Sequence, residues 1–519
     1  MAERRPTDPA GRGHPGPVAG IVAALAGRVP AGPVGGDPVD LAGPAGGDLA
    51  DLAGGDPVSL AVRAGESPLQ PGTGLLPLPV ELESRSGPGA PASYPADVAI
   101  DPALGPEAYQ LTTDADRPRI VAGDAAGAFY ARLTLSQLPV GPDGRLPALR
   151  VADRPRFGWR GVLLDVARHF LGTDDVLAFL DDLADLKLNR LHLHLTDDQG
   201  WRLQIDSWPR LAEVGGRSGS QGSAGGWYSK DDFRRIVAHA ADRHIVVVPE
   251  VDFPGHTNAA LVAYPELACP GVVPEPYEGD EVGFSTLDTA NELVYRFTAE
   301  VLREVAELSP GPWLHLGGDE CLSTPDEGYA EYVRRAARLV TGLGRIPVGW
   351  HEIGQAGGLP DGVVGQYWNY TIPEDGHAAR VRSLVAQGGK VILSPSDVAY
   401  FDMKYTADDL LGQDWAEGPT SLREAYGWEP TTVIDGLAET DLLGVEAAVF
   451  TEYLCGLDAV RSLAFPRLAA FAELAWSPAP APGQQRDFAG FTRRLAGYAR
   501  RWDARGVSYR RVPEVDWEA

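Results

Sequence analysis

Two adjacent carboxylates, Asp319 and Glu320, end the stretch Trp313 to Glu320, which begins with alternating apolar residues and passes through two glycines. This pattern predicts a buried strand that runs out into a loop. Neighbouring carboxyl groups can divide acid–base work, because one can give up a proton while the other stays ionised and stabilises positive charge. We therefore take this stretch as the centre of a candidate active site.

Polar and aromatic residues also follow seven other predicted strands, each time at the same end. Buried charges cost stability unless they are paired, so seven such groups in register indicate a site rather than scattered core polar residues. The segments are Asp165 to Phe170, His192 to Trp201, Pro249 to His256, Gly349 to Glu352, Gln366 to Trp368, Tyr400 to Tyr405 and Phe450 to Glu452.

The residue types in these segments are typical of a sugar pocket. Aromatic faces pack on the apolar face of a pyranose, while carboxylates and an arginine exchange hydrogen bonds with hydroxyls. A metal site is the alternative, because several residues could supply ligands. These residues could equally orient loops by hydrogen bonds, and we predict no metal and no cofactor. The potential ligands are His192, His194, Asp197, Asp198 and His256.

The spacing of the two acids limits the reactions that they can share. A retaining glycosidase that uses two carboxylates holds them about 5–5.5 Å apart, and an inverting one about 6.5–9.5 Å apart. Neighbours in an extended strand point to opposite faces, so we do not expect Asp319 and Glu320 to flank one glycosidic bond. One carboxyl would instead protonate the leaving oxygen. If the sugar carries a 2-acetamido group, its carbonyl oxygen can be the nucleophile, and Asp319 would orient the amide N–H.

The elements that must position these residues form an alternating series between residue 156 and residue 519. Eight strand-like runs alternate with stretches of helical periodicity, which predicts parallel βαβ units and a (β/α)8 TIM barrel. In such a barrel, groups at the carboxyl ends of the strands meet at one face. The predicted strands are Gly161 to Arg168, Arg190 to Asp197, His244 to Asp252, Trp313 to Glu320, Ile346 to Glu352, Val363 to Trp368, Lys390 to Pro395 and Gly444 to Glu452.

The part of the chain before the barrel divides into two segments. Residues 75–155 contain short strand-like runs and one helical run, Gly127 to Leu138, and predict a small α+β domain without visible chemistry. Residues 1–74 are rich in Gly, Ala, Pro and Asp, and we expect part of them to be a linker or poorly ordered chain. The fold class is therefore α/β, a TIM barrel preceded by a small α+β domain.

Bulk composition excludes some partners. The formal charge of −27 and the pI near 4.7 argue against nucleic acid and against an anionic membrane surface. No run of about 18 apolar residues is present, so we expect no membrane span. The run Val18 to Leu25 makes a poor signal-peptide core, so we expect a cytoplasmic location, with secretion as the alternative. Neither the oligomeric state nor a disulfide framework follows from the three cysteines.

Several of these strings together resemble family 20 of the glycoside hydrolases, the β-N-acetylhexosaminidases of bacterial type. The segment His315 to Glu320 is similar to the family's His-x-Gly-Gly-Asp-Glu signature, and the resemblance extends from about residue 156 to the end, more weakly over residues 75–150. The other matching strings are Leu164 to Phe170, Leu191 to Trp201, Pro254 to Thr257, Gly349 to His351 and Tyr400 to Tyr405.

The resemblance implies retaining exo-hydrolysis of terminal β-linked N-acetylglucosamine or N-acetylgalactosamine through an oxazolinium intermediate, with an amino-sugar oligosaccharide or glycoconjugate as partner. It implies that Glu320 is the general acid/base and that Asp319 and Tyr400 hold the acetamido group. By the same resemblance, Asp197 and His256 tune the acid. The implied substrate-binding residues are Arg168, Trp350, Trp368, Asp402, Trp415, Phe450 and Glu452.

One position departs from the family pattern. The family usually has tryptophan two residues before the glutamate of the eighth strand, whereas this chain has Phe450 before Glu452. Phenylalanine keeps an apolar wall but loses an N–H donor and some area. We expect activity to survive, with a wider acetamido pocket or an altered substrate preference. The alternative functions are a disaccharide-releasing enzyme similar to lacto-N-biosidase and a catalytically silent sugar-binding protein.

Overall fold

The computed structural model of the chain describes residues 74–518. The expectation for residues 1–74 lies outside this range, apart from Gly74 itself. Among the described residues, every helix is too short or too polar to cross a bilayer.

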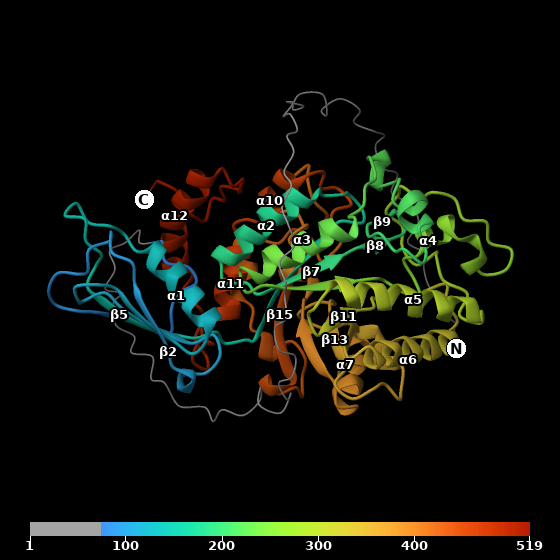
Figure 1. Ribbon diagram of the computed structural model, residues 1–519, viewed down its shortest axis with the longest axis horizontal. Coiled ribbons are helices and arrows are strands. Elements are labelled where there is room, and N and C mark those ends of the chain that lie inside the picture. Colours follow the sequence, from blue (N-terminus) through green and yellow to red (C-terminus); the bar gives the residue numbers. More distant parts are fainter. Residues whose placement is uncertain (1–73, 519) are drawn as a thin grey trace, which may run out of the picture. The chain divides into compact units, whose positions relative to one another are not determined.

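A closed barrel of eight parallel strands forms the larger part of the structure (Figure 1). The strands follow one another around the barrel in chain order, and the last pairs with the first, so the predicted fold class is confirmed. Most strands are shorter than the predicted runs, because the polar residues at their carboxyl ends leave the ladder and turn into loops. They are β6 (Trp159–Asp165), β7 (Arg190–His194), β10 (Val246–Glu250), β11 (Trp313–His315), β12 (Ile346–Trp350), β13 (Val364–Tyr367), β14 (Lys390–Leu393) and β15 (Leu442–Val449).

Amphipathic helices pack outside the strands. In α2, Val176, Phe179, Leu180 and Leu183 make a buried apolar stripe. Helices α2 and α3, and likewise α5 and α6, lie side by side (Figure 1). The helices of the barrel are α2 (Thr173–Asp185), α3 (Lys230–Ala241), α4 (Asn258–Ala263), α5 (Glu292–Leu308), α6 (Asp326–Gly342), α7 (His377–Ala386), α8 (Ser396–Ala399), α9 (Leu422–Gly427), α10 (Leu457–Ala464), α11 (Arg467–Trp476) and α12 (Phe488–Arg505).

One predicted helix is divided in two. The periodicity from Ala459 to Trp476 predicts a single helix, but α10 ends at Ala464 and α11 begins at Arg467. Pro466 lies between them, and a proline has no N–H to donate and crowds the preceding turn. The break therefore follows from a residue that was visible in the sequence.

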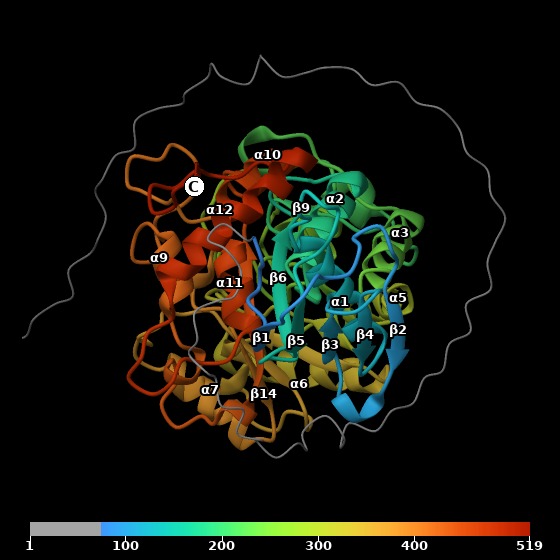
Figure 2. The same cartoon turned by 90° about the vertical axis from the view of Figure 1, so that its left-hand side faces the viewer.

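The region before the barrel is a five-stranded sheet with the order β1-β5-β3-β4-β2, which Figure 2 shows from left to right. Helix α1 (Ala125–Gln137) packs on this sheet. Two strands were not predicted: β2 is short and exposed at all four residues, and β5 ends at Asp153, just before the barrel begins. The strands are β1 (Glu81–Ser84), β2 (Asp97–Ile100), β3 (Tyr109–Thr112), β4 (Arg119–Ala122) and β5 (Leu149–Asp153).

Buried ion pairs join the α+β region to the barrel. The Arg160 guanidinium on β6 donates to Glu107, with Nη2 2.8 Å from Oε1 and Nη1 3.0 Å from Oε2. Lys187 Nζ lies 3.2 Å from Asp153 Oδ2, and Trp476 Nε1 donates to Asp153 Oδ1 at 2.9 Å. These contacts tie the start of the barrel to β5 and to the loop before β3.

Candidate active site

The acid pair lies in a loop that begins with two glycines, in a backbone conformation that requires glycine at the first position. After β11 the chain passes through Gly317 and Gly318 with φ values of 64° and 97°. A Cβ atom on Gly317 would lie 1.8 Å from Asp252 Oδ1, so any other residue would clash there. The Gly318 N–H donates to the same Asp252 oxygen at 2.8 Å. Asp252 thus fixes the turn that carries Asp319 and Glu320.

The two carboxylates lie near one histidine rather than on opposite faces of a strand. His256 Nε2 is 3.9 Å from Asp319 Oδ2 and 3.6 Å from Glu320 Oε2. Glu320 has a φ of 46°, in the left-handed region, so the backbone at the pair is not extended. The expectation that the side chains diverge as in an extended strand is therefore wrong, and the turn at Gly317 and Gly318 is the reason. The division of labour between the acids remains a prediction.

His256 connects the acid pair to Asp197, from the loop after β7. His256 Nδ1 lies 3.2 Å from Asp197 Oδ1, while Asp197 Oδ2 forms an ion pair with Arg168 Nη2 at 2.8 Å. Burial raises the pKa of Asp197, but Arg168 and His256 outweigh it and bring the pKa well below the usual range. Burial lowers the pKa of His256, but Asp197 and Asp319 outweigh this and raise it well above the usual value. The pair is therefore an imidazolium beside a carboxylate.

Glu320 is set up to carry a proton near neutral pH. Burial and the nearby charge of Asp319 raise the pKa of Glu320 to about 7, although His256 and Arg168 oppose the shift. Asp319 supplies part of that shift, and its Oδ1 is buried without a hydrogen-bond partner among residues 74–518. The arrangement thus places a protonated acid beside a carboxylate oxygen that is free to accept.

Arg168, in the loop after β6, is held by four side chains. Its Nη1 lies 3.2 Å from Asp165 Oδ2 and 3.4 Å from Glu452 Oε1, and Nε donates to Gln199 Oε1 at 3.1 Å. Asp197 is the fourth partner. These contacts fix the guanidinium at the mouth of the barrel.

Two further carboxyl groups at the mouth keep an unused oxygen. Asp402 Oδ1 accepts from the Phe450 N–H at 3.2 Å, while Asp402 Oδ2 and Glu452 Oε2 are buried without a partner in the described part of the chain. Burial and the charge of Glu452 raise the pKa of Asp402 to about 8. Such oxygens can accept hydrogen bonds from hydroxyls of a bound ligand.

Aromatic side chains line the space beside these groups. Trp350, Tyr400 and Phe450 belong to one apolar cluster, and the rings of Tyr400 and Phe450 are 5.4 Å apart. Trp368 donates its Nε1–H to Glu352 Oε1 at 3.0 Å. Trp415, which is 44% exposed, packs edge-on against Tyr400 and Trp368. The Tyr400 hydroxyl makes no hydrogen bond within residues 74–518.

The family comparisons agree with this geometry. The model described as "Glycosyl hydrolase family 20, catalytic domain" matches residues 157–479, and "Glycosyl hydrolase family 20, domain 2" matches residues 69–154. The chain belongs to glycosyl hydrolase family 20. The membership predicted from the motifs is confirmed, and with it the class of enzyme, a glycoside hydrolase.

Relatives and solved structures of family 20 cover most of the chain. A beta-N-acetylhexosaminidase of Cellulomonas fimi is 43% identical over 442 residues, which are 85% of this chain and 87% of the relative. The solved beta-N-acetylhexosaminidase of Streptomyces coelicolor A3(2) is 38% identical, with a TM-score of 0.80 over 86% of this chain and 99% of that one. The N,N'-diacetylchitobiase of Vibrio harveyi is 28% identical over 71% of this chain and 54% of its own length.

All the residues predicted for the family 20 site lie on the loops or strand ends at one mouth of the barrel. Sequence reasoning missed Asp165, Gln199 and Glu352 as parts of it. Asp165 holds both Arg168 and the Thr451 N–H, the latter at 2.9 Å, and Gln199 joins Arg168 to the Gly279 carbonyl. All three stand in the strand-end strings, so their position was a usable signal.

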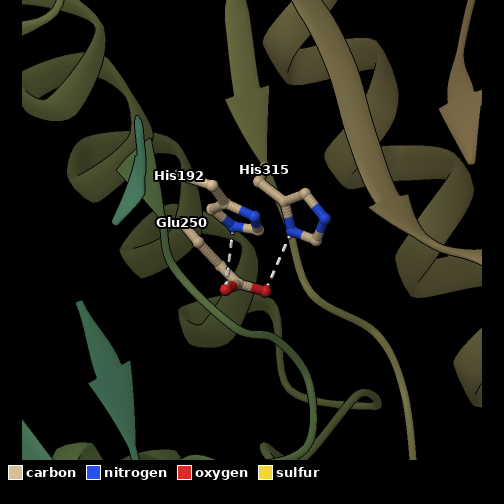
Figure 3. Close-up of side chains that lie close together, drawn as sticks. All are labelled: His192, Glu250 and His315. Atoms are coloured by element: carbon tan, nitrogen blue, oxygen red, sulfur yellow. Dashed lines mark ion pairs between the residues drawn. The ribbon is translucent and has the colours of Figure 1, made fainter. Parts of the chain in front are cut away.

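Of the potential metal ligands, His192 and His194 lie deeper in the barrel than His256, and they contact buried carboxylates. His192 and His315 flank the Glu250 carboxylate, with His192 Nε2 3.0 Å from Oε2 and His315 Nδ1 2.9 Å from Oε1 (Figure 3). His194 Nδ1 also contacts Glu250 Oε2, and His194 Nε2 lies 2.9 Å from Asp197 Oδ2. The ring nitrogens thus face carboxylates at hydrogen-bonding and ion-pair distances, which is the alternative considered for them above. The absence of a metal remains a prediction.

Proposed function

We propose that the chain is a retaining exo-β-N-acetylhexosaminidase, which removes terminal non-reducing N-acetylglucosamine or N-acetylgalactosamine by substrate-assisted catalysis. One observation carries the proposal: Glu320 holds a proton near neutral pH directly beside Asp319, which keeps a buried oxygen free. The names of the relatives, beta-N-acetylhexosaminidase and N,N'-diacetylchitobiase, support an amino-sugar oligosaccharide as substrate.

In the first step, Glu320 gives its proton to the glycosidic oxygen. The carbonyl oxygen of the 2-acetamido group attacks the anomeric carbon as the bond to the leaving oxygen breaks, which yields an oxazolinium ion. A pKa near the working pH suits this transfer, because the acid is then both protonated and strong enough to donate.

Asp319 and Tyr400 control the nucleophile. The free Asp319 oxygen accepts from the acetamido N–H, and its negative charge stabilises the positive charge that develops on the ring. The Tyr400 hydroxyl donates to the acetamido carbonyl oxygen, which orients it toward the anomeric carbon. Trp350, Trp368 and Phe450 enclose the acetamido methyl group.

Recognition of the sugar ring uses the polar side chains of the mouth. Arg168 donates to ring hydroxyls, and the unused oxygens of Asp402 and Glu452 accept from them. Trp415 flanks the leaving group.

In the second step, Glu320 acts as a carboxylate and removes a proton from water. The water oxygen attacks the anomeric carbon of the oxazolinium from the face that the leaving group left, so the configuration is retained.

Two substrates that differ only at the 2-position test this proposal. We expect the chain to hydrolyse an aryl N-acetyl-β-glucosaminide and to leave the matching aryl β-glucoside essentially intact, because the latter lacks the internal nucleophile. Equal rates on both would exclude substrate assistance, and no release from mildly acidic to mildly alkaline pH would exclude the enzyme altogether. A thiazoline mimic of the intermediate should inhibit competitively.

A further inference from the structure

The site described above is the upper end of a longer row of buried charges. From Asp197 the row continues into the barrel through His194, Glu250 and His192 to Glu446 on β15. Acids and histidines alternate along it, and each histidine lies between two carboxylates. All of these side chains are buried.

The distances along the row are those of direct ion pairs. His194 Nε2 is 2.9 Å from Asp197 Oδ2, and His194 Nδ1 contacts Glu250 Oε2. His192 Nε2 is 3.0 Å from Glu250 Oε2, and His192 Nδ1 is 2.7 Å from Glu446 Oε1. Glu446 ends the row, because it also accepts from Gln366 Nε2 at 2.9 Å and from Trp159 Nε1 at 2.8 Å.

We infer that His194 and Glu250 are positioning residues for the acid step: they hold Asp197 and His256 in place and thereby control the proton of Glu320. His194 can satisfy both neighbouring carboxylates only when both ring nitrogens carry a proton. As an imidazolium, His194 carries a positive charge that partly neutralises the negative charge of Asp197. Without it, only Arg168 and His256 would balance that charge. This inference rests on the proposed function, since it concerns the acid that function requires.

Several charged side chains surround Glu320 and His194. Asp319, His256, Arg168 and Asp197 face Glu320. Glu250 and Asp197 face His194, while the buried Asp252 lies near Asp319, His256, Glu250 and His194. Burial lowers the pKa of His194, but Glu250 and Asp197 outweigh it and raise the pKa well above its usual value. Burial and Asp319 raise the pKa of Asp252 well above its usual value, so Asp252 adds little negative charge.

Glu250→Gln is the test, because it removes one carboxylate of His194. Glu250 also contacts His192 and His315, but none of the residues assigned to the substrate. A neutral His194 can still donate to Asp197 but no longer offsets its charge, so the potential at Glu320 becomes more negative and its proton is held more tightly. We expect kcat/KM on chitobiose, whose leaving group needs protonation, to fall about tenfold and its alkaline limb to move to higher pH. With a 4-nitrophenyl glycoside, whose leaving group departs without help, the change should stay within about twofold.

Glu446→Gln is the matched control, since it removes an equally buried carboxylate two groups further from the acid. It should lower the melting temperature comparably but change both substrates by less than about twofold. His194→Gln is a second variant in case Glu250→Gln does not fold, because the amide can donate to Asp197 but cannot carry the charge. His194→Gln should, like Glu250→Gln, lose more activity on chitobiose than on the 4-nitrophenyl glycoside.

Two outcomes overturn the inference. One is an equal loss on chitobiose and on the aryl glycoside with an unmoved alkaline limb, which would make His194 and Glu250 purely structural. The other is an equally selective loss in Glu446→Gln, which would show no dependence on distance from Glu320. A wild-type chain that releases no N-acetylhexosamine at all would instead refute the proposed function.

Discussion

The mouth of the barrel and the junction with the α+β region both bury charged side chains, but they satisfy them differently. At the junction, Arg160, Glu107, Lys187 and Asp153 leave no side-chain atom buried without a partner among the described residues. At the mouth, such atoms remain on Asp319, Asp402, Glu452 and His256.

This difference separates stability from function. A buried polar atom without a partner costs folding free energy, so a chain keeps one where a ligand will complete it. The charged side chains of the junction are paired within the protein, so they contribute to stability. The mouth leaves buried polar atoms without partners, which lowers stability.

The largest effect is expected for Asp319→Asn at the mouth. The amide cannot stabilise the positive charge on the ring, so kcat should fall about 10²- to 10³-fold on activated and unactivated substrates alike. The melting temperature should hold or rise, because the substitution removes a charge that repels Glu320. If Asp319→Asn lowered the melting temperature but left the activity per folded molecule unchanged, Asp319 would serve stability rather than function, and the contrast with the junction would fail.

At the junction, Lys187→Met should do the opposite. It leaves the Asp153 carboxylate buried without its cation and removes the contact of Nζ with the Trp476 ring, 4.3 Å from the centroid. Breaking such a buried pair costs about 3 kcal/mol of unfolding free energy. Urea unfolding would measure this cost, and kcat/KM of the folded enzyme should stay within about twofold of wild type. A selective loss of activity would show that the junction reaches the site.

The pH profile sharpens the assignment of Glu320. Its pKa is raised to about 7, and the acid must be protonated, so kcat/KM on chitobiose should be constant below this value and fall about tenfold per pH unit above it. Initial rates at low substrate concentration from pH 5 to 9 would show the limb. Asp319→Asn should move it to lower pH, because the carboxylate that raises the pKa of Glu320 is gone.

The smallest effect is expected for Phe450→Trp. The ring packs against Tyr400 and under the Arg168 guanidinium, whose carbon lies 5.4 Å from the ring centroid, so a larger ring would narrow the proposed acetamido pocket. KM for the N-acetylglucosaminide should change by less than about tenfold, and bulkier 2-acylamido substrates should lose more. Inhibition constants for N-acyl variants of the thiazoline mimic would compare the two pockets. An unchanged acyl preference would show that Phe450 does not shape the pocket.

Much of the barrel could be predicted because it depends on local patterns. Period-two apolar runs and amphipathic stretches such as Thr173–Asp185 locate strands and helices, and parallel strands bring their carboxyl ends to one face. The residues of the site follow from that register. The short exposed strand Asp97–Ile100 carries no such pattern and was missed.

What could not be predicted depends on contacts between distant residues. The turn at Gly317 is fixed by Asp252, 65 positions earlier, so the backbone of the acid pair could not be derived from neighbouring residues. The row of charges likewise joins His192 to Glu446, which are 254 positions apart. Chain closure brings them together, since β15 pairs with β6 and β6 with β7.

The left-handed backbone of Glu320 has a consequence for evolution and design. A non-glycine residue at a φ of 46° costs about 1–2 kcal/mol, and glycine would relieve that cost and remove a half-buried carboxyl as well. Glu320→Gly should therefore melt at a higher temperature than wild type while losing the acid. Selection for thermal stability alone would remove the carboxyl that we propose as the general acid, so any effort to stabilise this chain must select for turnover at the same time.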